Sequence, residues 1–443
     1  MAVPGEINVG LMGLGVVGGG VAAALLGQRE EITRKIGRPM NLKKILVRDP
    51  DKPRESGIPT NLLTTNPEEI LTDQAIHVVV ELSGGTQPPA RFLKDALSAG
   101  KHVVTANKAL IAVHGNEIFR AAHEKGVIVA FEAAVAGGIP VIKSLREGLG
   151  ANRIEWVAGI INGTGNFILT HMRDEGRAFE DVLAEAQALG YAEADPTFDV
   201  EGIDAAHKLT ILASIAYGVP LQFEKAFTEG ISRITAEDVE QADNLGYVIK
   251  HLGISKRTDQ GLELRVHPTL IPKERLLANV HGVKNAIAVM GDAVGPTLYY
   301  GAGAGAEPTA SAVVADLLDV ARDIATDHHY RVPYLAFSGI DEDVSQLPIM
   351  PMEEITTAYY LRLLAVDRPG VLARVATILA EQGISIEALI QKEATEGELV
   401  PIILLTHRTK EKQMNEAIRE IEAMADIAGP VTRIRVESLD EGE

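Results

Sequence analysis

Short apolar runs alternate with longer segments of helical period over the first part of the chain. Runs with the length and composition of buried strands occur at 7–12, 42–47, 78–82, 102–105 and 127–131. Helix-like spacing of apolar residues occurs at 21–26, 89–99 and 115–125. Strands that alternate with helices predict a parallel, doubly wound sheet, an α/β fold that binds ligands beyond the carboxyl ends of its strands.

A glycine pattern, G-x-G-x-x-G, connects the first strand to the first helix at 13–18. The first glycine permits a tight turn, the second lets the backbone approach a pyrophosphate, and the third allows close packing of helix on strand. The phosphates would lie at the helix N-terminus, where free amides and the dipole favour anions. A plain glycine turn is the alternative, but this position at the start of such a unit favours a dinucleotide.

The end of the second strand carries Arg48 followed by Asp49. An acid there would accept a hydrogen bond from a ribose 2′-hydroxyl, whereas an arginine would accommodate a 2′-phosphate. Arg48 is the nearer residue, and other basic residues lie close by in the sequence. The pattern favours NADP over NAD.

Later strand ends carry further candidates. Ser83 and Gly84 follow the third predicted strand, and Thr105 and Lys108 end the fourth. Lys108 could contact cofactor or substrate, or it could point to solvent from a helix-capping loop. The glycine-rich segment 132–140 could turn carbonyls towards a hard cation, with Glu132 nearby, or it could be a close-packed hinge.

The central part of the chain predicts a mixed α+β domain on an open sheet. A strand at 154–161 and a turn at 162–166 precede helical segments at 179–189 and 205–217. Short strand signals follow at 278–283 and 286–290, then a glycine-rich stretch at 301–305 and a helix at 310–326. That stretch lacks the strand, GK[ST] and helix context of a P-loop, so it indicates close backbone approach.

An acidic loop and the start of a helix, residues 190–208, concentrate the most chemistry. The segment contains Glu193, Asp195, Asp199, Glu201, Asp204 and Lys208. Asp204 and Lys208 stand at i and i+4 of the helical pattern. Acids on a turn with a lysine one helical turn further on can bind an amino group and move a proton. A solvated acidic loop with a surface ion pair is the alternative.

A separate small unit follows a proline- and acid-rich linker. Strand signals at 359–366, 384–392, 399–406 and 431–436 and helical signals at 371–382 and 410–424 give the order βαββαβ. That order is ferredoxin-like. Because the unit has few catalytic side chains, we expect a role in binding or association.

The composition of the chain argues against several classes of partner and of chemistry. The net charge of −19 makes nucleic acid or an anionic membrane an unfavourable partner. The absence of cysteine excludes disulfides, thiolate metal sites and a cysteine nucleophile. No secretory signal pattern and no apolar run of about 18 residues occurs, so we expect a cytoplasmic protein without a membrane span.

Three motifs together resemble homoserine dehydrogenase, and the resemblance covers nearly the whole chain. The central signature reads Ala186-x3-Gly190-Tyr191-x3-Asp195-Pro196-x2-Asp199-Val200-x-Gly202-x-Asp204-x3-Lys208. Thr105-Ala106-Asn107-Lys108 and Glu132-Ala133-x-Val135-x-x-Gly138-x-Pro140 precede it in the family's order. Asp367-Arg368-Pro369-Gly370 before a helix resembles an ACT domain. With no aspartate-kinase segment ahead of these motifs, we expect the monofunctional bacterial form.

The resemblance implies reversible hydride transfer between L-homoserine and L-aspartate 4-semialdehyde. It implies Lys208 and Lys108 as catalytic residues, and Glu193, Asp199, Asp204 and Gly190 around the substrate. It implies cofactor contacts from Gly13, Leu14, Gly15, Val16, Val17, Arg48, Ser83, Gly84, Thr105, Lys108 and Gly305. It also implies a monovalent cation, expected to be Na⁺, at Glu132, Val135, Gly137 and Ile139.

The same resemblance implies an overall organisation. We expect a Rossmann domain at 1–133, a substrate and dimerisation domain at 134–320, a return helix and linker at 321–355, and the ACT domain at 356–443. L-threonine is the expected feedback effector, although Ser385 stands where many ACT domains have asparagine. A homodimer or homotetramer is expected.

Other functions fit the sequence less well. Aspartate-semialdehyde dehydrogenase requires a cysteine nucleophile, which this chain lacks. Another Rossmann dehydrogenase of amino-acid type would not need Lys208 together with Glu193. A non-catalytic sensor of NADP and an amino acid would not need two lysines where hydride transfer would occur.

Overall fold

The computed structural model describes residues 4–52, 57–326, 332–338, 347–391 and 399–439. The chain divides into two compact units, each assembled from separate segments of sequence. The first unit contains residues 1–163, 204–226 and 283–347, and the second contains 164–203, 227–282 and 348–443. Within the described residues, no helix has both the length and the apolar character needed to cross a membrane.

A parallel six-stranded sheet forms the centre of the first unit, and it confirms the predicted doubly wound α/β fold. Its order is β3-β2-β1-β4-β5-β6. The strands are β1 (Ile7–Met12), β2 (Met40–Leu46), β3 (Leu63–Thr64), β4 (Val78–Glu81), β5 (His102–Thr105) and β6 (Val129–Ala130). The sequence pattern did not predict β3, because two residues are too few to show a period.

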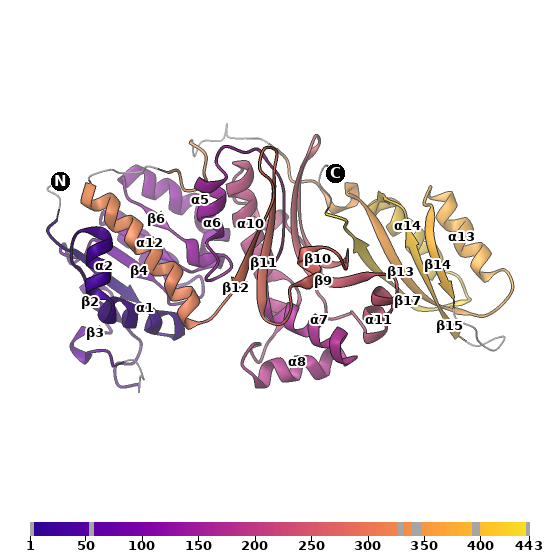
Figure 1. Ribbon diagram of the computed structural model, residues 1–443, viewed down its shortest axis with the longest axis horizontal. Coiled ribbons are helices and arrows are strands. Elements are labelled where there is room, and N and C mark those ends of the chain that lie inside the picture. The colour runs from indigo at the N-terminus through magenta and orange to yellow at the C-terminus, as the bar shows by residue number, and fades with distance from the viewer. Residues whose placement is uncertain (1–3, 53–56, 327–331, 339–346, 392–398, 440–443) are drawn as a thin grey trace. The chain divides into compact units, whose positions relative to one another are not determined.

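Helices cover this sheet, and one of them returns from far along the chain (Figure 1). They are α1 (Val16–Gly27), α2 (Arg29–Ile36), α3 (Glu68–Leu71), α4 (Pro89–Ser98), α5 (Lys108–Lys125) and α12 (Ala306–Thr326), with a short 3₁₀ turn at Thr60–Leu62. Helix α12 packs against α1 and α2. A Cβ at Gly20 would lie 3.0 Å from the Cβ of Ala310, so glycine allows α1 and α12 to approach closely.

The buried face of α12 follows helical spacing. Val313, Leu317, Val320 and Ile324 are buried in the same apolar core as strands β1, β2 and β4. Residues three and four apart lie on one face of a helix, so this stripe is what holds α12 on the Rossmann domain. Burying such a side chain contributes about 1.5–3 kcal/mol.

The rest of the first unit contains an antiparallel group of strands and the helix that carries Asp204 and Lys208. Strand β11 (Lys284–Gly291) pairs with β7 (Ile154–Ile160) and with β12 (Gly295–Ala302). Helix α10 (Ile203–Tyr217) is buried along nearly its whole length. Short helical turns connect these elements at Glu132–Ala134, Val141–Lys143, Ser144–Gly148 and Phe223–Lys225.

The second unit begins with helices and a long hairpin. The helices are α7 (Gly163–Glu175), α8 (Phe179–Ala188), α9 (Thr197–Val200) and α11 (Ala236–Asn244). Strands β9 (Tyr247–Thr258) and β10 (Gly261–Pro272) pair along their full length, and β8 (Phe227–Thr228) pairs with β10.

Three sequence predictions in this region differ from the structure. The predicted turn at 162–166 is wrong from Gly163 onward, where α7 begins, and the predicted strand at 278–283 starts inside a 3₁₀ turn, Leu276–Asn279. The long strands β9 and β10 were not recognised individually. Buried polar residues such as Lys250, Arg265 and His267 interrupt their apolar pattern, which hides a strand that is buried on both faces.

The C-terminal part of the second unit confirms the predicted βαββαβ order. It consists of β13 (Thr356–Val366), α13 (Val371–Glu381), β14 (Ile386–Gln391), β15 (Leu399–Thr406), α14 (Glu411–Glu422) and β17 (Ile427–Val436), with small pieces at Met352–Glu354 and Thr409–Lys410. The antiparallel order is β17-β13-β15-β14. Strand β17 also pairs with β10, where Thr269 faces Arg435.

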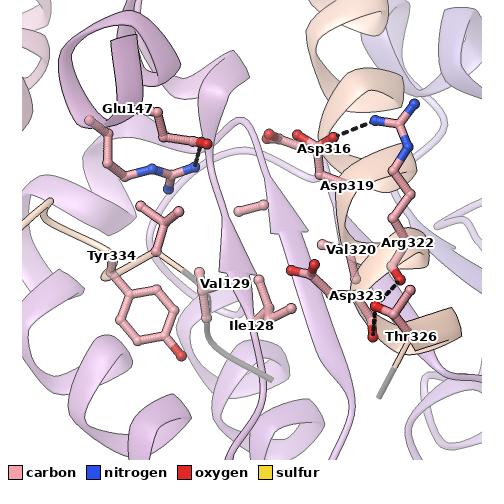
Figure 2. A pocket seen from close by; sticks show the side chains of 13 residues that line it. Ile128, Val129, Glu147, Asp316, Asp319, Val320, Arg322, Asp323, Thr326 and Tyr334 are labelled. Carbon is pink, nitrogen blue, oxygen red and sulfur yellow. Dashed lines mark hydrogen bonds and ion pairs between the residues drawn. The ribbon is translucent and has the colours of Figure 1, made fainter. Parts of the chain in front are cut away.

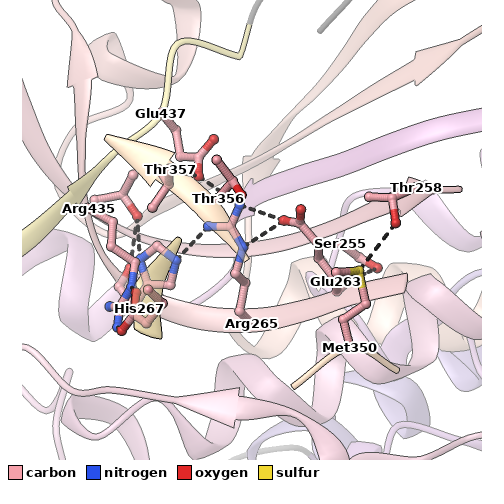
Figure 3. Close-up of polar contacts among 12 residues, drawn as sticks. Ser255, Thr258, Glu263, Arg265, His267, Met350, Thr356, Thr357, Arg435 and Glu437 are labelled. Atoms are coloured by element: carbon pink, nitrogen blue, oxygen red, sulfur yellow. Dashed lines mark hydrogen bonds and ion pairs between the residues drawn. The ribbon is translucent and has the colours of Figure 1, made fainter. Parts of the chain in front are cut away.

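Buried ion pairs accompany that pairing (Figure 3). Arg265 of β10 lies 2.8 Å from the Glu263 carboxylate and 2.7 Å from that of Glu437. Arg435 of β17 lies 2.5 Å from the carboxylate of Glu411 on α14 and 3.1 Å from that of Glu229. A buried guanidinium must be fully paired to be tolerated, so these contacts tie the C-terminal sheet to β10.

Candidate active site

A carboxylate shared by two lysines forms the centre of the candidate site in the first unit. The Asp204 carboxylate lies 2.7 Å from Nζ of Lys208 and 2.9 Å from Nζ of Lys108. Lys208 also donates to the Ile161 carbonyl at 2.7 Å, and the Asn162 side-chain amide donates to Asp204 at 2.8 Å. Asp204 and Lys208 are buried, whereas the Lys108 side chain is 34% exposed.

The local fold places each of these side chains. Asp204 and Lys208 stand one turn apart on α10, as their spacing predicted. Asn162 lies two residues after the end of β7, and this position brings its side-chain amide to Asp204. Lys108 is the first residue of α5, and the Asn107 side chain caps that helix by accepting from the Leu110 amide. The residues before α5 thus form the helix-capping loop that was the alternative interpretation, but the Lys108 side chain contacts Asp204 instead of pointing only to solvent.

The two lysines determine the charge of the carboxylate. Burial alone would raise the pKa of Asp204, but the Lys208 and Lys108 ammonium groups outweigh it and lower the pKa well below its usual range. Asp204 is therefore ionised over the whole physiological range. Burial also lowers the pKa of the neighbouring His207 to about 4, so its ring, packed on Phe223, is neutral at pH 7.

The glycine loop after β1 has the shape that a pyrophosphate requires. A Cβ at Gly13, where φ is 97°, would lie 2.8 Å from the Leu82 backbone. A Cβ at Gly18 would lie 2.1 Å from the Gly13 carbonyl oxygen, whereas a Cβ at Gly15 meets nothing within 4 Å. The space at the N-terminus of α1 is therefore open, and its free amides can receive an anion.

Glu81, which the sequence analysis did not select, connects two strand ends of the Rossmann sheet. Its fully buried carboxylate accepts from the Ser83 amide at 2.7 Å and from the Ser83 hydroxyl at 2.6 Å. It also accepts from the Thr105 hydroxyl at 3.1 Å and from the Asn107 amide at 3.4 Å. Glu81 thus fixes Ser83, Thr105 and the residue before Lys108.

The remaining predicted cofactor residues lie at loop positions of the first unit. Arg48 is exposed two residues beyond β2, while the Asp49 carboxylate accepts from the amide of Asp51 at 2.9 Å. Gly84 is exposed with φ of 72°. Gly305, with φ of 119°, immediately precedes α12. Such backbone angles favour glycine.

The residues predicted to bind a cation, Glu132, Val135, Gly137 and Ile139, are buried, and the Glu132 carboxylate is used to accept backbone hydrogen bonds. Both oxygens of Glu132 accept backbone amides, from Ile142 and Lys143 at 2.9 Å each. A Cβ at Gly137 would lie 2.6 Å from the Gly303 carbonyl oxygen. The described residues contain no cluster of three or more His, Cys, Asp or Glu side chains suited to a metal.

A pocket of about 400 Å³ next to this loop is also acidic (Figure 2). Asp316 of α12 accepts from the Glu132 amide at 2.8 Å. Burial, and then the nearby Glu132 carboxylate, raise the pKa of Asp316 to about 7. The pocket contains none of the residues at the Asp204 centre, so we assign it no part in the site.

The predicted substrate residues Gly190, Glu193 and Asp199 lie in the second unit. Gly190, with φ of 75°, lies two residues beyond the end of α8, and Glu193 is exposed. Asp199 lies in α9, and its carboxylate accepts from the Thr164 hydroxyl at 3.4 Å. The structure brings Lys208, Lys108 and Asp204 together. Gly190, Glu193 and Asp199 lie in the segment between α8 and α10.

Sequence signals existed for the residues that were missed. Glu81 ends an otherwise all-valine buried strand, where a charged residue needs partners. Asn162 was interpreted only as part of a turn. Its link to Asp204 joins segments 42 residues apart, which no local pattern reveals.

Comparison with known proteins identifies the family. The sequence family described as homoserine dehydrogenase matches residues 140–318, its NAD-binding domain matches 13–132, and the ACT domain matches 359–426. The chain is 62% identical over 435 residues to the homoserine dehydrogenase of Pseudomonas aeruginosa, covering 98% of this chain and 99% of the relative. It is 54% identical over 435 residues to that of Neisseria gonorrhoeae, again covering 98% and 99%.

Solved structures agree. A homoserine dehydrogenase from Thiobacillus denitrificans matches with a TM-score of 0.93 and 61% identity, covering 98% of this chain and 99% of that one. A hyperthermophilic archaeal homoserine dehydrogenase in complex with NADPH matches with a TM-score of 0.61 and 26% identity, covering 71% of this chain and 97% of that one. The chain therefore belongs to the homoserine dehydrogenase family, whose members are oxidoreductases with a nicotinamide-nucleotide-binding domain.

Proposed function

We propose that this enzyme interconverts L-homoserine and L-aspartate 4-semialdehyde with NADP, in the biosynthesis of threonine, methionine and isoleucine. The observation that carries the mechanism is the Asp204 carboxylate held between Lys208 and Lys108 at 2.7 and 2.9 Å. Bound NADP⁺ supplies the acceptor for the hydride that leaves the alcohol carbon. The residues of the chain must then bind the substrate, orient it and move one proton.

Lys208 is the proposed general acid and base. In the oxidative direction its neutral amine takes the proton of the homoserine hydroxyl, and in the reductive direction its ammonium gives that proton to the developing alkoxide. The Ile161 carbonyl and Asp204 fix the position of Nζ, so the proton is transferred at a defined point. Such general acid–base catalysis typically contributes ~10²–10⁴-fold.

Lys108 is the proposed second catalytic lysine. It begins α5 directly after the end of β5, on the side of the sheet where doubly wound folds bind their ligands. Its ammonium can therefore face both the reacting oxygen and the nicotinamide. Asp204 balances its charge and links it to Lys208.

The acidic loop is proposed to hold the substrate ammonium. The Glu193 carboxylate forms no ion pair with another described residue, so it is available for a ligand. Asp199 and the backbone at Gly190 would assist it. The positive φ of Gly190 favours glycine at this turn.

The cofactor is proposed to lie over the glycine loop. Gly13, Leu14, Gly15, Val16 and Val17 would cover its phosphates at the open N-terminus of α1. Ser83, Gly84, Thr105, Lys108 and Gly305 are proposed as further contacts.

NADP is proposed rather than NAD because the exposed Arg48 can face a 2′-phosphate, while Asp49 caps its own turn. The archaeal relative, solved with NADPH, supports this choice. We also propose Na⁺ at the carbonyls of Glu132, Val135, Gly137 and Ile139.

Regulation by L-threonine at the ACT domain, assembly into a homodimer or homotetramer, and domain boundaries at 133, 320 and 355 are proposed as well. The matched ACT family supports an amino-acid effector. The residues predicted for the linker at 327–331 and 339–346 lie outside the described part of the chain.

L-homoserine oxidation, followed at the NADPH absorbance for wild type and Lys208→Ala, tests the proposal. We expect turnover with NADP that falls by at least ~10²-fold in the variant. Turnover that the substitution leaves untouched would contradict the role of Lys208. Measurable NADP binding without turnover in the wild type would favour a non-catalytic sensor instead.

A further inference from the structure

The segment at the end of β7 supplies two hydrogen-bond partners to the Asp204 centre. The Ile161 carbonyl accepts from Nζ of Lys208 at 2.7 Å, and the Asn162 side chain donates from Nδ2 to Oδ2 of Asp204 at 2.8 Å. Asn162 is 5% exposed, so solvent competes only weakly for this hydrogen bond. Two consecutive residues therefore hold the two members of the ion pair, the lysine through the backbone and the carboxylate through a side chain.

The two oxygens of the Asp204 carboxylate have different partners. Oδ2 accepts from Lys208 at 2.7 Å and from Asn162, whereas Oδ1 lies 2.9 Å from Nζ of Lys108. The χ2 torsion of an aspartate is broad and roughly two-fold, so its own rotamer preference does not select the oxygen that faces each lysine. A donor fixed on a third element can make that selection. The Asn162 amide is such a donor, because it comes from neither α10 nor α5.

The backbone around Asn162 is held on both sides. Ile160, the last residue of β7, pairs with Ala286 of β11. After Asn162, a Cβ at Gly163 would lie 2.8 Å from the Val283 carbonyl oxygen, so glycine lets the chain pass close to this neighbouring segment. The position of the amide is therefore set by the sheet, and not by the ion pair that it contacts.

An amide also suits the charge of this centre. Lys208, Lys108 and Asp204 place two ammonium groups beside one carboxylate, and the nearby His207 ring is neutral at pH 7 because burial lowers its pKa to about 4. A third cation would repel both lysines, whereas an amide donates a hydrogen bond without a charge. Donation to an ionised carboxylate favours the ionised form. Asn162 thus acts together with the lysines to leave the transferable proton on Lys208.

We propose that Asn162 is a positioning residue for the reaction. Its amide fixes the orientation of the Asp204 carboxylate, and the carboxylate in turn fixes Nζ of Lys208 and Nζ of Lys108 at the reacting oxygen. Asn162 therefore acts through Asp204. The effect on turnover rests on the proposed function, whereas the effect on the carboxylate and its two lysines does not.

Homoserine oxidation by Asn162→Ala tests the effect on turnover. We expect kcat to fall by ~10–10²-fold, because small misplacements of a catalytic group are costly, while KM for NADP changes little. The solvent deuterium isotope effect on kcat should increase, since proton transfer becomes slower relative to the other steps. A variant that had only lost stability would keep the wild-type isotope effect. Unchanged kcat and an unchanged isotope effect would overturn the proposal.

Asn116→Ala is the matched control. The Asn116 side chain joins α5 to the chain after α10, because it donates to the Leu221 carbonyl at 3.0 Å and accepts from the Leu221 amide at 3.1 Å. We expect this substitution to lower the urea midpoint without changing kcat or the isotope effect. Changes equal to those of Asn162→Ala would overturn the specific role of Asn162.

Asn162→Asp separates the hydrogen-bond donor from the volume of the side chain. Aspartate has nearly the same shape as asparagine, but once ionised it has no donor for Oδ2 of Asp204. In alkaline buffer we therefore expect kcat to fall at least as far as in Asn162→Ala. Wild-type kcat in this variant would show that shape alone is required, and it would overturn the proposal.

NMR of the side-chain ammonium groups in lysine-labelled, full-length protein examines the centre without substrate. Lys208→Arg identifies the Lys208 signal. We expect that signal to shift in Asn162→Ala and to keep its position in Asn116→Ala, and an unmoved signal in Asn162→Ala would overturn the proposal. A wild type that does not oxidise homoserine would refute the proposed function, and the NMR comparison would still decide the role of Asn162.

Discussion

Replacing Asp204 by asparagine tests whether the shared carboxylate organises catalysis. The substitution preserves size, but it removes the charge between Lys208 and Lys108 and replaces one acceptor oxygen by an NH₂ donor. Two ammonium groups then share a centre without a counterion. We expect slower turnover, a changed pH profile and lower stability.

The magnitude follows from the burial of the centre. Asp204 is 4% exposed and Lys208 is 8% exposed, so solvent screens their attraction only weakly. Breaking a buried ion pair costs about 3–5 kcal/mol, and we expect destabilisation up to that size, limited because Lys208 can release its proton. Misplacement of the proton carrier should lower kcat by ~10²-fold. Because the charges of Asp204 and Lys208 are coupled, the dependence of kcat on pH should also differ between the variant and the wild type.

The assay records kcat for homoserine oxidation across pH, together with the urea midpoint of the same preparations. Asp319→Asn is the matched control, because Asp319 pairs with Lys143 and Arg322 at the surface of the same unit, where such pairs contribute only ~0–1 kcal/mol. An Asp204→Asn enzyme with unchanged kcat and an unchanged pH profile would refute the assigned role of this carboxylate.

Three further predictions concern other parts of the chain. Glu81→Gln, which keeps the shape but not the charge that holds Ser83, should raise KM for NADP several-fold; unchanged KM and kcat would show that this carboxylate is only structural. Arg48→Ala should raise KM for NADP more than for NAD, and equal changes would contradict recognition of the 2′-phosphate. Burial, followed by Arg173, lowers the pKa of Lys250 to about 7. The unfolded state, with its ordinary pKa of ~10.4, then binds more protons between pH 7 and 10, so stability rises with pH there. Lys250→Met should remove that rise in urea titrations while the exposed Lys273→Met keeps it, and a rise retained in Lys250→Met would contradict the assignment.

Local sequence patterns were sufficient to predict those elements whose conformation depends on neighbouring residues. The glycine loop with β1 and α1, the other long strands of the parallel sheet and the βαββαβ unit all follow from short-range period and turn residues. They failed for β9 and β10. There, Arg265 is buried against Glu263 and Glu437, so a charge stands in a fully buried strand and breaks the apolar pattern.

The sequence by itself determined the elements with a regular local pattern, the glycine loop and the pairing of Asp204 with Lys208, because these depend on residues within a few positions of each other. Only the tertiary structure showed that Lys108 reaches the same carboxylate, 96 positions before Asp204 in the numbering, and that Asn162 supports it. It alone showed that Glu81 joins two strand ends. Long-range side-chain contacts arise when the sheet brings strand ends together, and linear spacing carries no record of which ends will meet.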